Sequence, residues 1–306
     1  MASGGVVSIA APRIWRVAIH GAPPLLFFFA AIAGWKAASA AWLVMLEAAL
    51  AIYFSLKWLT WCRAAASVRP PLGRSLGYLL LWPGMDAMQF LDVKAAVARP
   101  AARAWLAALA NTLIGGLLIC KMVPITRQVS APAAGWVGLA GIILVLHFGL
   151  FGLMALAWQA AGVCAEPIMR APLRAHGVAD FWARWNTAFR DAGAQLVYRP
   201  LLRHTSPKRA MVVVFILSGI LHELVISLPA EGGYGLPMAY FLFQAVALSA
   251  ERTRVGRRWG LGRGVFGRVF ALGVVTLPIV ALFPPQFASR VLLPLIDALS
   301  AFGGGL

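Results

Sequence analysis

His222 lies inside an apolar run, residues 210–228, that contains few polar side chains. As a helix, this run is about 29 Å long, close to the thickness of the hydrocarbon core of a bilayer. His222 would then lie about 18 Å from the start of the helix, far from either membrane surface. An ionisable group is costly to hold at that depth, so its presence indicates a function, the alternative being a histidine that only hydrogen-bonds a neighbouring helix. A neutral imidazole in this position can take a proton from a hydroxyl group and make it a nucleophile.

The second candidate, Asn186, lies in an aromatic segment upstream, DFWARWNTAFRDAGAQLVYRP at residues 180–200. The pattern predicts one amphipathic helix that either lies along the cytoplasmic membrane interface or dips into the protein. In the second case, the amide of Asn186 can hydrogen-bond a carbonyl oxygen that becomes negative during a reaction. At helical spacing the segment has two adjoining faces, one with Phe181, Trp185 and Phe189 and one with Trp182, Asn186 and Arg190.

The elements that would position these residues are membrane helices. Of the 306 residues, 61% are hydrophobic and only 12% are charged, and apolar runs of helix length recur along the chain. This composition predicts an all-α integral membrane protein with a single domain over residues 1–306. We expect about eight transmembrane helices plus interfacial or re-entrant helices around a buried reaction chamber.

Residues 77–91 form an apolar segment that is too short to cross a membrane and is interrupted by Pro83-Gly84. We expect this segment to be interfacial or re-entrant and to be buried in protein. A basic loop that includes Lys57 is expected before it, and a long arginine-rich connection covers residues 159–209. The expected spans are residues 23–41, 42–56, 104–119, 135–158, 210–228, 236–250, 265–283 and 287–302.

The net charge is +17, from 27 Lys and Arg residues against 10 Asp and Glu residues. Most of the basic residues lie in alternate loops, so positive-inside topology explains the charge and no nucleic-acid partner is expected. The N-terminus is then cytoplasmic, and in a bacterium the membrane would be the cytoplasmic (inner) membrane. Cys62, Cys120 and Cys164 lie singly, without the spacing of a metal site or a disulfide framework, so no metal is expected.

Two motifs resemble the membrane-bound O-acyltransferase superfamily, and within it the plant-type wax synthases. FWARWN at residues 181–186 is followed by SGILHEL at residues 218–224. Three shorter stretches are also similar: WPGMD at residues 82–86, HFG at residues 147–149 and EPIM at residues 166–169. The resemblance covers roughly residues 77–250, which we expect to be the motif-bearing core.

The resemblance implies transfer of a long-chain acyl group from acyl-CoA to a lipid hydroxyl, with a fatty alcohol as the expected acceptor and a wax ester as the product. It implies that His222 is the general base and that Asn186 is its catalytic partner. Acyl-CoA is then a co-substrate, no cofactor is expected, and the lipid bilayer supplies the acceptor. The residues expected to contact the substrates are Trp182, Trp185, Arg190, Ser218, Glu223 and His147.

Three alternatives remain open at this point. Within the same chemistry, the acceptor can be a sterol or a diacylglycerol. In a non-enzymatic membrane transporter, Glu47, His147, His222 and Glu223 would form a proton relay, although the internal repeat common in transporters is absent from the sequence. In a b-type haem protein, His147 and His222 would be the iron ligands.

Overall fold

The computed structural model of this chain describes residues 21, 23, 24, 26 and 40–303. Every regular element from residue 40 onward is a helix, and five helices are long and apolar enough to cross a membrane. An all-α integral membrane protein is therefore confirmed, whereas the count of about eight spans stays a prediction. Most of the first expected span, residues 23–41, lies outside the described residues.

The five candidate membrane helices account for nearly half of the described chain. Three of them contain π-helical turns, labelled η, in which the helix widens locally. They are α2 (Ala41–Val68), α5–η1–α6 (Ala102–Val129), α7–η2–α8 (Ala131–Ala160), α12–η5–α13 (Pro207–Ala230) and α16–α17 (Gly264–Leu282). Helix α14 (Leu236–Glu251) is also apolar but has only 16 residues.

The remaining helices are short and connect or cover the long ones. They are α3 (Leu72–Leu81), α4 (Ala87–Leu91), the 3₁₀ turn η3 (Pro172–Arg174), α9 (Val178–Arg184), α10 (Thr187–Gly193), η4 (Ala194–Tyr198), α11 (Arg199–Leu201), α15 (Arg254–Arg258), α18 (Pro285–Phe287), η6 (Ala288–Leu292) and α19 (Leu293–Gly303). Within the longer spans, η2 covers Ile143–Leu150 and η5 covers Glu223–Ser227.

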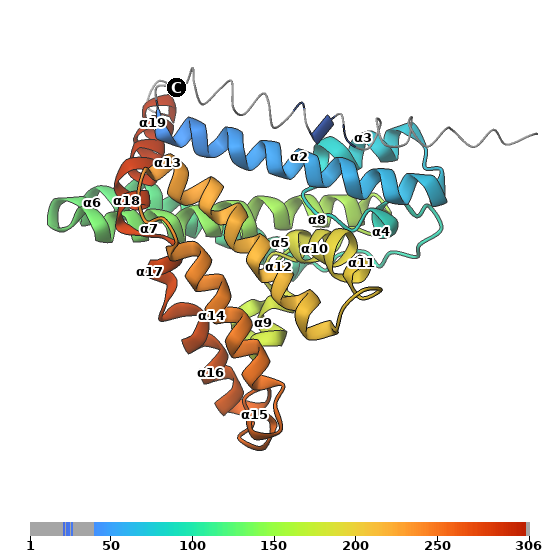
Figure 1. Cartoon of the computed structure of the whole chain (residues 1–306). Coiled ribbons are helices and arrows are strands. Elements are labelled where there is room, and N and C mark those ends of the chain that lie inside the picture. The colour runs from blue at the N-terminus through green and yellow to red at the C-terminus, as the bar shows by residue number, and fades with distance from the viewer. Residues whose placement is uncertain (1–20, 22, 25, 27–39, 304–306) are drawn as a thin grey trace, which may run out of the picture.

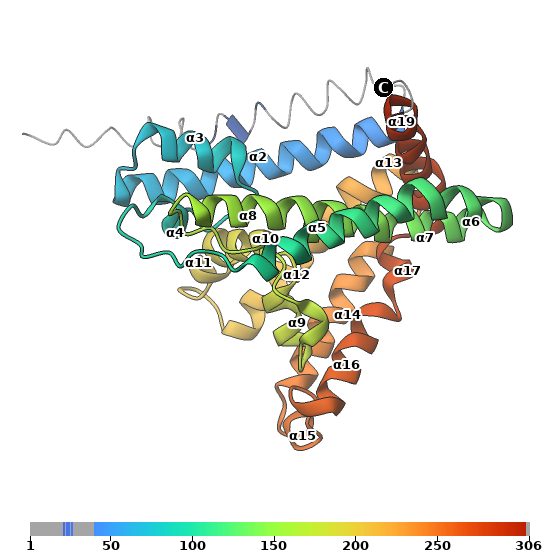
Figure 2. The ribbon, with the colours of Figure 1, turned by 180° about the vertical axis from the view of Figure 1, so that it is seen from behind.

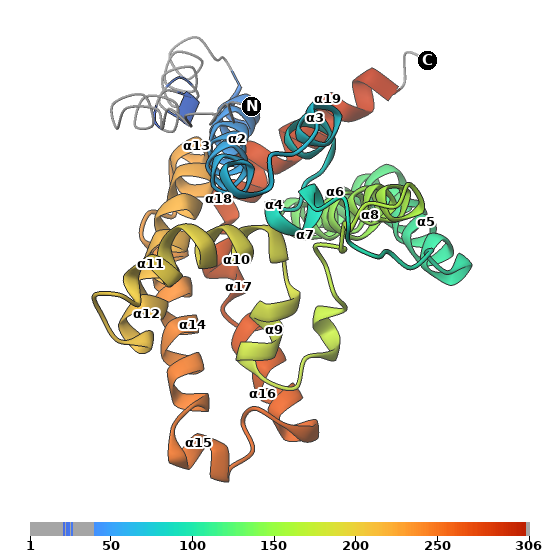
Figure 3. The same ribbon diagram turned by 90° about the vertical axis from the view of Figure 1, so that its right-hand side faces the viewer.

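The long helices form two groups. Helix α2 and the helices between residues 102 and 160 run roughly parallel in one layer (Figures 1 and 2), whereas α12, α14 and α16 extend away from that layer. Seen from the side, α9 lies against α14 and α16 (Figure 3), and both contacts are present in the structure. The segment with the aromatic motif is therefore placed by the second group of helices.

The segment around Pro83-Gly84 does not cross a membrane, as predicted. Two short helices, α3 and α4, flank an extended loop at residues 82–86. One set of its large side chains is buried, with Tyr78, Met85, Phe90 and Leu91 at 0% exposure, whereas Leu80, Leu81 and Met88 are exposed. The element is too short to span, as predicted, and only one side of it is buried in protein.

The predicted loop after residue 56 is wrong, because α2 continues to Val68 and includes Lys57. The ammonium group of Lys57 is fully buried, donates to the Gly84 carbonyl at 2.7 Å, and lies 3.2 Å from the centroid of the Tyr78 ring. A carbonyl and an aromatic face can together compensate a buried cation. The helix continues because this basic side chain has partners inside the protein.

Lys57 should therefore contribute to stability through the loop at residues 82–86. Lys57→Met removes the donor and leaves the buried Gly84 carbonyl unpaired, so we expect a loss of about 1–3 kcal/mol in the free energy of unfolding. Thermal unfolding in detergent measures this change, with the exposed Lys94→Met as the control. An unfolding temperature equal to that of the control would contradict the assigned contact.

Candidate active site

The ring of His222 is held in one orientation by its own helix. Helix α12 ends at His222, and the π-helical turn η5 begins at the next residue; such turns are frequent at functional sites. The Nδ1 atom lies 2.7 Å from the backbone oxygen of Ser218. Because a carbonyl oxygen only accepts, Nδ1 carries the proton, and in the neutral ring Nε2 keeps a free lone pair. This is the tautomer that a general base requires.

The hydroxyl of Ser218 takes no part in orienting the ring. Its Oγ atom donates to the backbone oxygen of Val214 at 2.9 Å, within the same helix. The contact between residues 218 and 222 is therefore made by the backbone carbonyl of Ser218, and the predicted contact of the Ser218 side chain with substrate stays a prediction.

The predicted single helix over residues 180–200 is wrong, because it is interrupted at Asn186. Helix α9 ends at Arg184, Trp185 is extended, and Asn186 has a φ of 42° in the left-handed region. Asparagine tolerates this region better than most residues, and α10 begins directly after it. The two helical faces inferred from the spacing therefore do not exist as such.

The break at Asn186 is stabilised by the chain between residues 166 and 170. The backbone N–H of Thr187 donates to the Ile168 carbonyl at 2.8 Å, and that of Arg170 donates to the Arg184 carbonyl at 3.0 Å. The N–H of Asn186 lies 3.2 Å from the sulfur of Met169. These contacts replace bonds of a continuous helix, so the stretch EPIM fixes the backbone at Asn186.

The aromatic residues of the motif are part of the protein core. Trp182 packs against Phe215 and Phe241, each with ring centroids 5.9 Å away, and its Nε1 donates to Gln244 Oε1 at 3.3 Å. Trp185 stacks on Phe181 with centroids 5.7 Å apart and an interplanar angle of 14°. Both tryptophans thus have structural contacts, and their predicted contacts with substrate stay predictions.

Phe241 joins the two sequence motifs. Its ring centroid lies 4.5 Å from that of His222, and the same phenylalanine packs against Trp182. Sequence reasoning treated α14 only as a span and missed Phe241 and Gln244. The available signal was Gln244, a lone amide in an apolar run. The structure thus brings the motifs together through α14, while the approach of the Asn186 amide to His222 stays a prediction.

Arg190 and Glu223 have protein partners. The guanidinium of Arg190 binds the carboxylate of Asp191 at 2.5 Å and the Ala183 carbonyl. Glu223 Oε1 accepts from the backbone N–H groups of Gly235 at 3.0 Å and Met238 at 3.1 Å, at the start of α14. The contacts found for Glu223 therefore fix α14 beside the His222 helix.

Five buried side-chain polar atoms have no hydrogen-bond partner within the described part of the chain; two are Nε1 of Trp61 and Nε of Arg268, and the other three belong to acidic or histidine side chains. These three are Nδ1 of His147, Oε2 of Glu223 and Oε2 of Glu47. His147 lies in η2, with its ring 5.6 Å from that of Phe151 in an edge-to-face contact. Buried polar groups of this kind are normally satisfied by water or by a ligand.

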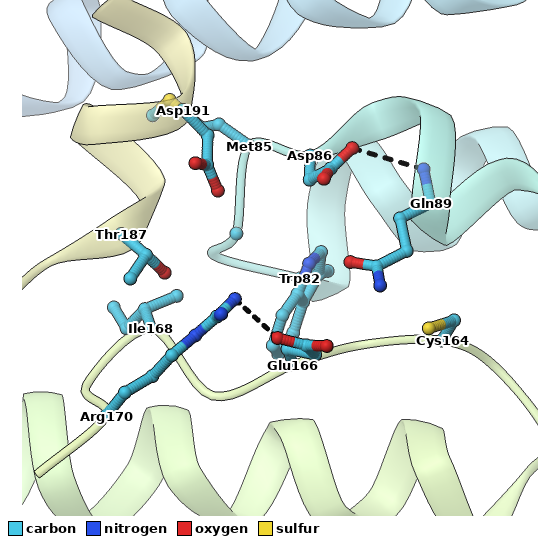
Figure 4. A pocket seen from close by; sticks show the side chains of 11 residues that line it. Trp82, Met85, Asp86, Gln89, Cys164, Glu166, Ile168, Arg170, Thr187 and Asp191 are labelled. Carbon is cyan, nitrogen blue, oxygen red and sulfur yellow. Dashed lines mark hydrogen bonds and ion pairs between the residues drawn. The ribbon is translucent and has the colours of Figure 1, made fainter. Parts of the chain in front are cut away.

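A small polar pocket lies beside α10. It separates the loop at residues 82–86 from the chain at residues 164–170, and in Figure 4 the carboxylate of Asp191 points into it. Burial raises the pKa of Asp191, with the Arg190 guanidinium acting in the opposite direction. Arg170 pairs with Glu166 at 2.5 Å on the opposite wall. The pocket brings together WPGMD and EPIM, two stretches that the sequence analysis singled out.

Residues 165–243 match the membrane bound O-acyl transferase family. The matched segment contains Asn186, His222 and the Phe241 ring that links their motifs. The match supports the membrane-bound O-acyltransferase superfamily and, at that level, an acyltransferase activity. No curated protein matches the chain.

The backbone bond to His222 gives a prediction for Ser218. Ser218→Ala removes a hydroxyl that bonds only to Val214 of its own helix, and keeps the carbonyl that orients the ring. We expect acyltransferase turnover per mole of folded enzyme to stay within about threefold of that of the unchanged protein. This change is smaller than the effect expected from losing one hydrogen bond to the substrate. A drop of more than about tenfold would instead assign the hydroxyl to substrate binding.

Proposed function

We propose that this protein is an acyl-CoA-dependent O-acyltransferase that transfers a long-chain acyl group to a lipid hydroxyl, with a fatty alcohol as acceptor and a wax ester as product. The observation that carries this proposal is the hydrogen bond from His222 Nδ1 to the Ser218 carbonyl. It leaves Nε2 free as a base, inside a helix of the segment that matches the acyltransferase family.

The proposed reaction is a direct attack of the acceptor on the thioester. Nε2 of His222 takes the hydroxyl proton while the acceptor oxygen forms a bond to the thioester carbonyl carbon. The amide of Asn186 donates to the carbonyl oxygen, which becomes negative in the tetrahedral intermediate. When the C–S bond breaks, the imidazolium returns its proton to the CoA thiolate. The products are the ester and free CoA, and no cofactor takes part.

The backbone at Asn186 supports its proposed role. Hydrogen-bond donors stabilise a developing charge best when their position is set before the reaction begins. Asn186 lies at a helix break that is fixed on both sides by backbone hydrogen bonds to residues 168–170. The side chain of Asn186 is partly buried and makes no hydrogen bond with the described residues. Its amide is therefore available to a substrate.

The two proposed substrates would reach the site by different routes. We propose that acyl-CoA enters from the cytoplasmic side, where the basic loops would face its phosphates, and that the acceptor enters laterally from the bilayer. The buried unpaired atoms on Glu47, His147 and Glu223 support a polar interior that holds water or substrate. Sterols and diacylglycerol are the other acceptors to compare.

Two functions from other classes make different predictions. In a proton-relay transporter Glu223 would have to exchange protons through its unpaired Oε2, because Oε1 is held by two backbone N–H groups. In a haem protein, purification would give a Soret band. Incubation of purified protein with labelled acyl-CoA and a panel of fatty alcohols, sterols and diacylglycerol separates these functions and identifies the acceptor.

Three substitutions test the mechanism. His222→Ala removes the base, and general-base catalysis typically contributes about 10²- to 10⁴-fold, so turnover should fall at least about a hundredfold. Asn186→Ala should cost on the order of 10²-fold through the lost carbonyl contact. Donor affinity should change little in both variants, because the lost interactions belong mainly to the transition state.

His147→Ala is the control for a buried histidine that is not the base. It should lower the amount of folded enzyme more than the turnover of each folded molecule. The measurement is the acyl-transfer rate per mole of folded protein for all three variants. If His222→Ala keeps more than about a tenth of the turnover, His222 is not the general base.

A further inference from the structure

We propose that Glu251 is a positioning residue for acyl transfer: with Gln244 and Phe241 on the same helix, α14, it holds the Asn186-bearing segment against His222. This inference rests on the proposed function and extends it to a residue outside both motifs and outside the family match. Its test therefore includes a readout that does not depend on catalysis.

The carboxylate of Glu251 caps the start of α9. Glu251 is 8% exposed, and its Oε2 accepts from the backbone N–H of Val178 at 2.5 Å. The N–H of Ala179 lies 3.4 Å from both carboxylate oxygens. The first N–H groups of a helix have no partner within the helix, so an acceptor from another element ties that end down. A buried carboxylate in turn needs such donors, because its desolvation is costly.

The surroundings of this carboxylate are shaped for close approach. A Cβ atom added at Gly177, the residue before α9, would lie 2.8 Å from Glu251 Oε2. A Cβ atom added at Gly262 would lie 3.3 Å from Oε1. Glycine on both sides therefore lets the start of α9 and the loop before α16 meet at the end of α14. This packing limits how far α9 can move while the bonds to Glu251 are intact.

Gln244 makes a second connection between the same elements. Its side chain is fully buried, its Oε1 accepts from Trp182 Nε1 on α9 at 3.3 Å, and its Nε2 donates to the Val274 carbonyl on α16 at 2.9 Å. One amide therefore bonds α9 and α16 to α14. With Glu251 at the start of α9 and Gln244 near its end, the short helix is held at two points.

Phe241 connects this arrangement to the base. At 100° per residue, Phe241, Gln244 and Glu251 lie within about 80° of one another on α14. The ring of Phe241 lies 4.5 Å from the ring of His222, and Glu223 ties the start of α14 to the His222 helix. One face of α14 thus contacts the His222 ring at one end and the beginning of α9 at the other.

The consequence for catalysis follows from the order of residues. Helix α9 leads directly into Trp185 and Asn186, so a shift of α9 moves the Asn186 amide relative to His222. A displacement of about 1 Å in a catalytic group can cost on the order of 10²-fold in rate. Loss of the Glu251 bonds should therefore lower kcat and leave the KM for acyl-CoA nearly unchanged.

The test compares two substitutions of Glu251 with a control on the same helix. Glu251→Leu removes both acceptors, whereas Glu251→Gln keeps one oxygen that can accept from Val178. Ser249→Ala is the matched control, because its hydroxyl bonds only to Ala245 of α14. We expect kcat per folded enzyme to fall about tenfold to a hundredfold in Glu251→Leu. Glu251→Gln should recover most of this loss, and the control should match the unchanged protein.

A double substitution separates positioning from general stability. If Glu251 acts through Asn186, then Glu251→Leu should cost little further turnover once Asn186→Ala is present. Losses that multiply would overturn the proposal, as would a Glu251→Leu variant with the turnover of Ser249→Ala. Should Glu251→Leu yield no folded protein, Glu251→Asp decides: its carboxylate is one methylene shorter, so the same loss of turnover is expected, and normal turnover would overturn the proposal.

Hydrogen exchange tests the contact without catalysis. In folded protein, the peptide covering residues 177–186 should exchange faster in Glu251→Leu than in Glu251→Gln or Ser249→Ala. Equal exchange in the three variants would overturn the proposed role of Glu251. An unchanged protein that transfers no acyl group to any acceptor would overturn the proposed function alone, and the exchange rates would still decide the contact.

Discussion

Polar side chains inside an apolar helical protein must find their partners within the protein, and here those partners are mostly backbone groups. Lys57 donates to the Gly84 carbonyl, and Glu223 and Glu251 each accept from backbone N–H groups at or beside the start of a helix. His222 donates to the Ser218 carbonyl. Backbone groups are free where a helix starts, ends or breaks, so the buried polar residues and the irregular segments occur together. Asn186 lies at such a break, and His222 lies where α12 passes into the π-helical turn η5.

The sequence was sufficient for the fold class, and it supplied two candidate catalytic residues whose role stays a prediction. Apolar runs and sparse charge predicted membrane helices, and the interruption at Pro83-Gly84 predicted a segment that does not span. These inferences succeed because they depend on hydrophobicity and on local breakers. The pairing of Asn186 with His222 came from the spacing of two motifs that both lie in the family match.

The sequence failed where a distant partner changed the local structure. Helical spacing over residues 180–200 predicted one helix, but residues 168–170 pair with the chain around Asn186 and break it. Lys57 was assigned to a loop because its charge suggested water, although Gly84 and Tyr78 accommodate it inside the protein. The contributions of Phe241, Gln244 and Glu251 depend on which helices become neighbours. No periodicity along the chain contains that information.

The orientation of the His222 ring has a consequence for the evolution of this site. Its partner is a main-chain oxygen, so any residue that keeps position 218 helical supplies the same acceptor. The choice of which ring nitrogen carries the proton therefore does not depend on the side chain at position 218. Helix-compatible substitutions at position 218 should therefore leave the hydrogen bond to Nδ1 in place. Position 218 is thus a suitable place for substitutions that leave the orientation of the His222 ring unchanged.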